Sequence, residues 1–198
     1  MPFMLTDIND FAECLEGAVA ESGNPRGHLT SAMLVKHFSK LQVWRQTFEN
    51  VENDGDDEQY DILRIMKHPV YKWPNKAPGA DMLSAQTLLC HALLLCQGSY
   101  EDKTKHFMEM LMPNKEESIS TSNKKLLQAH ETMCRLATVS IFELARTFKK
   151  DDAAEDCPLT KKQLQVLLSD TIPDCRDEEF FEEVFENSGT ISREKFQM

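Results

Sequence analysis

At four places in this 198-residue chain, a branched aliphatic residue is followed directly by Ser or Thr where a polar loop gives way to a helical pattern. These pairs are Leu29-Thr30, Leu83-Ser84, Ile119-Ser120 and Ile191-Ser192. A hydroxyl at this point caps the following helix, because it accepts a hydrogen bond from a backbone N–H that has no partner within the helix. In paired helix–loop–helix units, the aliphatic residue lies in a short extended bridge to a partner loop. The pattern therefore predicts four such units, joined two by two.

Apolar residues around these four places recur every three or four positions, which is the spacing of one face of an α-helix. Helices are predicted over residues 7–20, from 31 to 41 with an extension towards 51, over 83–97, from Ser99 onward and over 124–149, with shorter ones over 60–68, after Thr160 and over 177–185. The segment 83–97 is apolar on almost every side, which predicts the most buried helix, ended by Gly98 in the left-handed conformation. Ser99 and Asp102 form the cap pattern of the next helix. The segment 124–149 fits one long helix or two with a bend.

The composition agrees with a helical fold and narrows the choice of partners. Glycine and proline are sparse, at 7 and 8 residues, and 33 acidic residues against 22 basic ones give a net charge of −11. Duplex DNA and anionic membranes are therefore excluded as expected partners, since binding to either depends on Lys and Arg. No run of about 18 apolar residues occurs, and the opening MPFMLTDINDF lacks the features of a secretory signal. We expect a soluble cytoplasmic protein without membrane insertion.

No combination of nucleophile, base or metal ligands stands out in the sequence. Six Cys and six His are scattered without CxxC or HExxH spacing, so no zinc site is predicted. Cys90 and His91 are adjacent, but neighbouring residues of a helix point about 100° apart and their side chains do not hydrogen-bond to each other. The motifs GxSxG, GxxxxGK[ST] and GxGxxG are absent. We therefore expect no enzymatic activity, no catalytic residues and no cofactor.

With their polar loops and capped helices, the four units resemble the EF-hand family, especially neuronal calcium sensor-like proteins, which have four hands in two lobes. Residues 83–111, LSAQTLLCHALLLCQGSYEDKTKHFMEML, resemble the exit helix of a second hand and the entering helix of a third. Residues 180–196, FFEEVFENSGTISREKF, resemble a fourth hand. Similar eroded EF-hand regions accompany TBC-domain and TLDc-domain proteins. The resemblance implies an all-α fold of four degenerate EF-hand-like units in two lobes, residues 1–98 and 99–198, with short β bridges between paired loops.

An EF-hand loop binds calcium through oxygen atoms at positions one, three, five and twelve, and has glycine at position six. Placing the aliphatic residue at position eight fixes the register of each loop. The ligand positions then hold Ser22, Asn24, Arg26 and Met33 in the first loop, Lys76, Pro78, Ala80 and Thr87 in the second, and Met112, Asn114, Glu116 and Asn123 in the third. The fourth loop, counted from Phe185, reaches Ile191 two residues early and has Lys195 near its last position. These loops are predicted to be mostly or wholly unable to bind calcium, the third holding an ion weakly at best.

One acidic stretch offers an alternative calcium site. Placing Gly55 at position six makes Asn50, Glu52, Asp54 and Asp61 the ligands, which is a tolerable set of oxygen atoms. Position eight would then be Asp57, which cannot form the apolar bridge between loops. A solvated acidic loop and a single calcium site near residues 50–61 both remain open.

The function class that remains is binding. Two lobes of this kind present an apolar groove that accepts an amphipathic or basic helix, and methionine side chains would give that groove deformable walls. The predicted contact residues are Trp44, Leu93, Phe107, Met108, Leu111 and Phe142, of which Trp44 fits the core equally well. We expect an interaction or scaffold module for a protein or peptide partner. The alternatives are a calcium sensor with one working site, and a regulatory domain of a larger signalling or GTPase-regulating protein.

Overall fold

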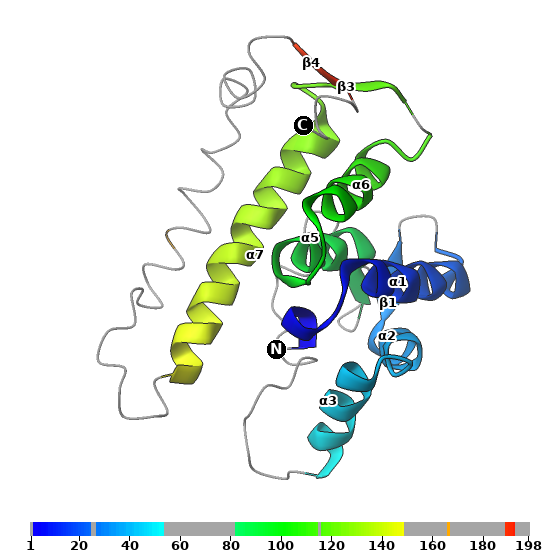
Figure 1. Ribbon diagram of the computed structural model, residues 1–198, viewed down its shortest axis with the longest axis vertical. Coiled ribbons are helices and arrows are strands. Elements are labelled where there is room, and N and C mark those ends of the chain that lie inside the picture. Colours follow the sequence, from blue (N-terminus) through cyan, green and yellow to red (C-terminus); the bar gives the residue numbers. More distant parts are fainter. Residues whose placement is uncertain are drawn as a thin grey trace. The chain divides into compact units, whose positions relative to one another are not determined.

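The computed structural model describes residues 2–24, 27–53, 82–114, 116–148, 166 and 189–192, and Figure 1 shows the path of the chain. The described residues are mostly helical, with six α-helices, one 3-10 helix and four short strands. The short helices predicted over 60–68 and 177–185 lie outside these residues, and of the one predicted after Thr160 only Val166 is described, as helical. Contacts divide the chain into a first unit, Met1–Met110, and a second unit, Leu111–Met198. Among the described residues, no helix has the length and apolar character needed to cross a membrane.

The first unit contains most of the helices. Its elements are η1 (Pro2–Leu5), α1 (Ile8–Ser22), β1 (His28–Thr30), α2 (Ser31–Phe38), α3 (Gln42–Asn53), β2 (Met82–Ser84), α5 (Ala85–Leu95) and nearly all of α6 (Tyr100–Leu111). Helix α1 begins after Asp7, whose carboxylate accepts a hydrogen bond from the Asn9 N–H at 2.8 Å, and ends at Gly23 in the left-handed conformation. Contacts group nearly all of α6 with the helices that precede it, and the predicted lobe boundary before Ser99 stays a prediction. The His106 ring, which hydrogen-bonds Asn9 on α1 at 2.9 Å, is one such contact.

Strands β1 and β2 form an antiparallel pair in which Leu29 lies opposite Leu83. Both side chains are buried, at 0% and 4% exposure, so the predicted aliphatic bridge is confirmed. The hydroxyls that follow also act as predicted, because each accepts a backbone N–H from the first turn of its helix. The Met33 N–H donates to Thr30 Oγ1 and the Thr87 N–H donates to Ser84 Oγ, both at 3.3 Å.

The second unit repeats the strand pair. Strand β3 (Ser118–Ser120) runs antiparallel to β4 (Thr190–Ser192) with Ile119 opposite Ile191, and Figure 1 shows the two strands side by side. Both isoleucines are buried, at 4% and 0% exposure. The predicted pairing of these two residues is therefore also confirmed.

The start of the long helix α7 (Lys124–Phe148) differs from the prediction. Ser120 was expected to cap it, but a turn follows β3 and Ser120 Oγ accepts the N–H of Ser122 instead, at 3.3 Å. The cap is Asn123, whose side-chain oxygen accepts the Lys125 N–H at 2.8 Å. Asparagine is as good a cap as serine, so the helix starts at the later residue. Of the two predicted forms of this segment, one continuous helix is the correct one.

The helix predicted from residue 31 towards 51 is interrupted. Helix α2 ends at Phe38 and α3 begins at Gln42. At the break, the hydroxyl of Ser39 donates to the Val35 carbonyl at 2.6 Å, and the Ser39 N–H donates to the same oxygen at 2.9 Å. A serine side chain that hydrogen-bonds to the backbone in this way offers an alternative to the helical pattern. The break allows α2 and α3 to turn their apolar faces towards one core.

Gly98 has a role other than the predicted helix stop. Helix α5 ends at Leu95 with Cys96 in an extended conformation, and Gly98 lies beyond it with φ at +137°. A Cβ atom at Gly98 would lie 2.6 Å from Cγ2 of Ile8, a residue that is itself fully buried. The glycine is needed because the chain passes directly over the start of α1.

The substitution Gly98→Ala is therefore expected to destabilise the protein by about 2 kcal/mol, through backbone strain and the clash with Ile8. Unfolding in urea would measure the loss. The matched control is Gly23→Ala, where φ is +57° and nothing lies within 4 Å of an added Cβ. Only the left-handed backbone then contributes, about 1 kcal/mol. Equal losses for both variants would contradict the close approach at Gly98.

The core of the first unit is an aromatic cluster. Phe11, Phe38 and Trp44 are fully buried and come from α1, α2 and α3 respectively. The Phe38 ring lies 4.8 Å from both the Phe11 and the Trp44 rings, measured between centroids. Aromatic pairs at this separation stabilise a core beyond the area they bury. Helix α5 closes the cluster with seven buried residues out of eleven.

Candidate functional site

The first predicted ion loop, between α1 and β1, is closed by hydrogen bonds within the chain. Ser22 Oγ accepts the Asn24 N–H at 3.2 Å and donates to the Val19 carbonyl at 2.8 Å. The Gly27 N–H donates to the Asn24 carbonyl at 2.9 Å, and Gly27 has φ at +63°. Ser22 and Asn24 occupy predicted ligand positions one and three. The Ser22 hydroxyl already makes hydrogen bonds that shape the turn. Arg26 lies outside the described residues.

A glycine in the same conformation precedes β4. Gly189 stands two residues before Ile191, as Gly27 stands two residues before Leu29, and both have φ at +63°. In each pair of strands the glycine carbonyl accepts a backbone N–H from the partner segment, Ala85 to Gly27 at 2.9 Å and Thr121 to Gly189 at 3.2 Å. The donor is in both cases two residues beyond the partner aliphatic residue. This repeated bond was missed from the sequence, where the G-x-[LI] spacing was the signal for it.

The third loop, between α6 and β3, places few oxygen atoms where a cation would need them. Met112, at position one, is buried and offers only a thioether. Asn114 Nδ2 donates to Glu116 Oε1 at 3.3 Å, so two of the other predicted ligands contact each other. Asn123, at position twelve, caps α7. These contacts give the loop a fixed role in packing and capping.

The alternative calcium ligands are only partly within the described chain. Asn50 and Glu52 lie in the last turns of α3, which continues to Asn53, while Asp54 and Asp61 lie outside the described residues. Of the second loop's ligand positions, only Thr87 is described, and it is buried in α5. Across the residues that the structure describes, no three His, Cys, Asp or Glu side chains come close enough together to hold a metal ion. The single calcium site near residues 50–61 stays a prediction.

Cys90 and His91 are both buried in α5, where neither is charged at neutral pH. Burial raises the pKa of the Cys90 thiol to about 12 and lowers the pKa of the His91 ring to about 4. The Cys90 Sγ contacts Met110 Sδ at 4.0 Å, and the His91 ring lies 4.4 Å from the Phe3 ring. A protonated thiol is a poor nucleophile, so the chemistry of this pair in the folded state is that of apolar packing.

A second cysteine and histidine meet on α7, one turn apart. The Cys134 Sγ lies 3.8 Å from His130 Nε2, and partial burial lowers the pKa of the His130 ring. The sequence carried the signal in the i, i+4 spacing, which places both on one helix face. Beside them, Glu131 accepts hydrogen bonds from Arg135 Nε and Nη2 at 3.0 and 2.7 Å. Two adjacent faces of α7 therefore carry an imidazole with a thiol, and an ion pair whose carboxylate is buried.

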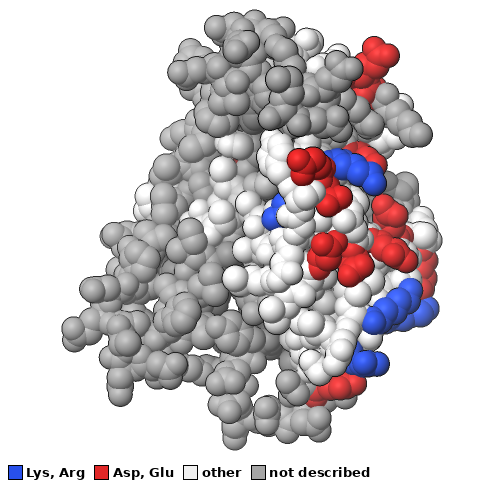
Figure 2. Space-filling model, in the orientation of Figure 1, with Lys and Arg blue, Asp and Glu red and all other residues white. Residues whose placement is uncertain are grey.

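Charged side chains of the first unit also join α1 to α2. Glu21 accepts hydrogen bonds from Lys36 Nζ at 2.7 Å and pairs with His37 Nε2 at 2.8 Å, and these two partners lower the pKa of the Glu21 carboxyl. Gly17 leaves room for the histidine, because a Cβ there would lie 2.8 Å from His37 Nδ1. Figure 2 shows acidic side chains gathered with fewer basic ones on the visible face of the described residues.

The predicted partner-binding residues lie in different environments. Trp44 is fully buried, and its Nε1 donates to Thr6 Oγ1 at 2.9 Å, which places it in the core. Leu93, Met108 and Leu111 are also buried, and Phe107 is half-buried. Phe142 lies on α7, but its side chain is outside those described. A contact of these residues with a partner stays a prediction, and for Trp44 it would require opening the core.

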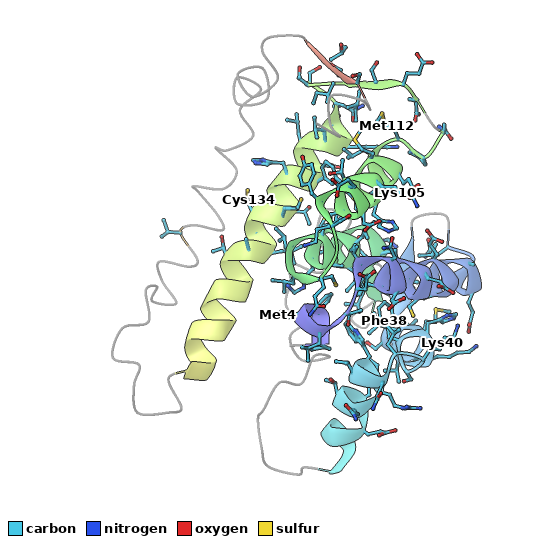
Figure 3. All side chains as sticks on the ribbon, viewed as in Figure 1. Met4, Phe38, Lys40, Lys105, Met112 and Cys134 are labelled. Carbon is cyan, nitrogen blue, oxygen red and sulfur yellow. The ribbon has the colours of Figure 1, made fainter. Side chains whose placement is uncertain are left out.

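A site that the sequence did not indicate surrounds Phe3. This residue is fully buried although it precedes every α-helix, and its ring lies 5.3, 5.0 and 4.4 Å from those of Phe11, Trp44 and His91. Figure 3 shows Met4, the next residue, on the short η1 turn. The opening residues therefore form part of the core rather than a simple extension of the chain.

Comparison with known proteins finds no family model, no curated protein and no solved structure that matches this chain. The evidence for its function therefore comes from its own residues and contacts.

Proposed function

We propose that this chain is a non-catalytic interaction module of two EF-hand-like lobes, which keeps its shape without calcium and binds a protein segment. The observation that carries the proposal is the repeat of one arrangement in both units. In both units, a left-handed glycine is followed two positions later by an aliphatic residue, which lies opposite a partner aliphatic residue. These residues are Gly27, Leu29 and Leu83 in the first unit, and Gly189, Ile191 and Ile119 in the second. This is the geometry expected of paired helix–loop–helix units.

Independence from calcium is supported by the contacts inside the described loops. Ser22, Asn114 and Asn123 each hydrogen-bond to the protein itself, and Met33 and Met112 supply sulfur at positions where calcium requires oxygen. A loop held by such bonds has its conformation before any ion arrives. The module would then bind its partner with the same affinity in the presence and absence of calcium.

The proposed partner is an amphipathic helix with a basic face. The net charge of −11 favours basic ligands and speeds their association. Apolar contact surface is also available, because Met4, Leu5 and Tyr100 are 49%, 64% and 63% exposed in the first unit. Phe107, which is half-buried in the first unit, remains a proposed contact residue. An apolar stripe on a basic helix matches both features.

A calorimetric titration tests this function. A basic amphipathic helical peptide is expected to bind equally in calcium and in chelator, and the melting temperature of the free protein is expected to be the same in both. The alternative, a sensor with one site near Asp54, predicts that calcium at 100 times its dissociation constant stabilises the fold by about 2.7 kcal/mol, a rise of about 5–10 °C. Asp54→Ala would abolish that rise. Failure of the peptide to bind in either condition would overturn the proposed function.

A further inference from the structure

The segment Pro2–Thr6 occupies the first unit in the way that a bound peptide occupies a pocket. Phe3 is fully buried and Pro2 is buried beside it, whereas Met4 and Leu5 are 49% and 64% exposed. The segment thus inserts one aromatic side chain and leaves its next two side chains in solvent. Aromatic side chains buried in well-packed pockets are common hot spots of binding.

The walls of this pocket come from distant parts of the sequence. Phe11 lies on α1, Trp44 on α3 and His91 on α5, and each ring lies within 5.3 Å of the Phe3 ring, centroid to centroid. Figure 3 shows the side chains of these helices in the first unit. None of the walls belongs to the segment itself, so the pocket is built by the helical body of the unit.

Polar contacts then fix the segment beyond its anchor. Thr6 Oγ1 accepts a hydrogen bond from Trp44 Nε1 at 2.9 Å and donates to the Pro2 carbonyl at 2.8 Å. Gln97 binds the main chain of the segment. Its Nε2 donates to the Met4 carbonyl and its backbone N–H donates to the Thr6 carbonyl, both at 2.9 Å. A pocket for one side chain combined with main-chain hydrogen bonds is a recurring mode of peptide recognition.

We infer that this aromatic pocket is a peptide-binding site, that Pro2–Thr6 is its internal ligand, and that a segment of a partner protein with the same chemistry takes its place. The required chemistry is a phenylalanine for the pocket and, three residues later, a hydroxyl for Trp44 Nε1. The residues between them are unconstrained, since those of the internal ligand are exposed. This inference deepens the proposed function and rests on it, because it names where a partner binds and what it must carry.

The internal ligand can be weakened without changing the pocket. In a Trp73→Phe background, which leaves Trp44 as the only tryptophan, Phe3→Ala is expected to lower the melting temperature by about 6–20 °C. Toluene should restore part of that loss, because an apolar cavity of this kind binds small aromatic molecules. Leu5→Ala is the matched control within the segment, and no change is expected for it since its side chain is exposed. The inference would be overturned if Phe3→Ala left the melting temperature unchanged, or if toluene did not raise the melting temperature of Phe3→Ala.

The binding site itself is tested in trans on the full chain. The variant Phe3→Ala with Thr6→Val, again in the Trp73→Phe background, is titrated with the peptide MPFMLTD while the indole N–H resonance of Trp44 is followed by NMR. We expect saturable binding with a shift of that resonance, binding at least about tenfold weaker for the peptide with Phe replaced by Ala, and no shift when the internal segment is intact. If the variant is unfolded, the peptide should restore its folding. No binding or rescue, or equal binding by the intact chain, would overturn the inference.

These experiments can contradict the proposed function and the proposed peptide-binding site independently of each other. A basic helical peptide that binds while MPFMLTD does not would leave the interaction module standing and remove the aromatic pocket as its site. Binding of MPFMLTD with no binding of a basic helix would leave the pocket standing and remove the amphipathic helix as the partner.

Discussion

Leu29→Asp is expected to destabilise the first unit by about 4–5 kcal/mol, which is close to the whole stability of a marginal domain. Leu29 is fully buried opposite Leu83, which is itself 4% exposed. A carboxylate at this position would lose its water without gaining a basic partner across the strand pair, and an unpaired buried charge is among the costliest substitutions. Urea unfolding followed by tryptophan fluorescence measures the loss, since the buried ring of Trp44 reports on this unit.

The neighbouring residue supplies the control. Thr30→Asp introduces the same charge one position later, where the side chain is half-buried and caps α2 through the Met33 N–H. Aspartate is at least as good a helix cap as threonine, so stability should be retained or should rise slightly. If both variants lost the same stability, the effect would come from charge in this loop and not from the aliphatic bridge.

The strand pairs could be predicted from the sequence because their signal is local and repeated. In the first unit, each aliphatic residue of the bridge lies between a polar loop and a hydroxyl that caps the next helix, as at Leu29 and Thr30, and each has one partner of the same kind. Two requirements coincide there, since the side chain must be buried and the next residue must start a helix. Patterns that satisfy two physical requirements at once are more specific than apolar spacing alone.

The predictions that were wrong depended on one residue with two possible roles. Ser120 can cap a helix, but the structure gives that role to Asn123, three residues later. Gly98 can end a helix, but it lies where Ile8 leaves no space for a side chain. Ser39 can sit inside a helix, but its hydroxyl takes the Val35 carbonyl at the break between α2 and α3. In each case, contacts beyond the local sequence decide between the roles.

The aromatic pocket could not be predicted, because its members share no spacing. Phe3 and Thr6 belong to the opening residues, and their partners Trp44 and His91 lie far along the chain. Trp44 fitted either core or surface by sequence, and its hydrogen bond to Thr6 is what places it in the core. Only the tertiary arrangement brings these groups together.

The same pocket predicts a dependence of stability on pH. Burial lowers the pKa of the His91 ring from 6.5 to about 4, so between these values the unfolded chain binds a proton that the folded chain does not. Stability is therefore expected to fall as the pH drops from about 6.5 to 4, and to be unaffected by this group above 6.5. The loss amounts to about 3 kcal/mol, since a tenfold change in proton affinity corresponds to about 1.4 kcal/mol. Urea unfolding at a series of pH values measures it.

His91→Gln isolates the contribution of this ring, because glutamine keeps hydrogen-bonding groups at the position and does not titrate. The variant should lose most of the slope of stability against pH between 4 and 6.5. His130→Gln is the matched control on α7, where the ring is only half-buried and its pKa is lowered less by desolvation, so its removal should change the slope less. If the two variants changed the slope equally, or if His91→Gln kept the full slope, the proton-linked loss would arise elsewhere. A retained slope would also mean that the ring against Phe3 can be protonated without cost, and that the pocket is open to water in the folded protein.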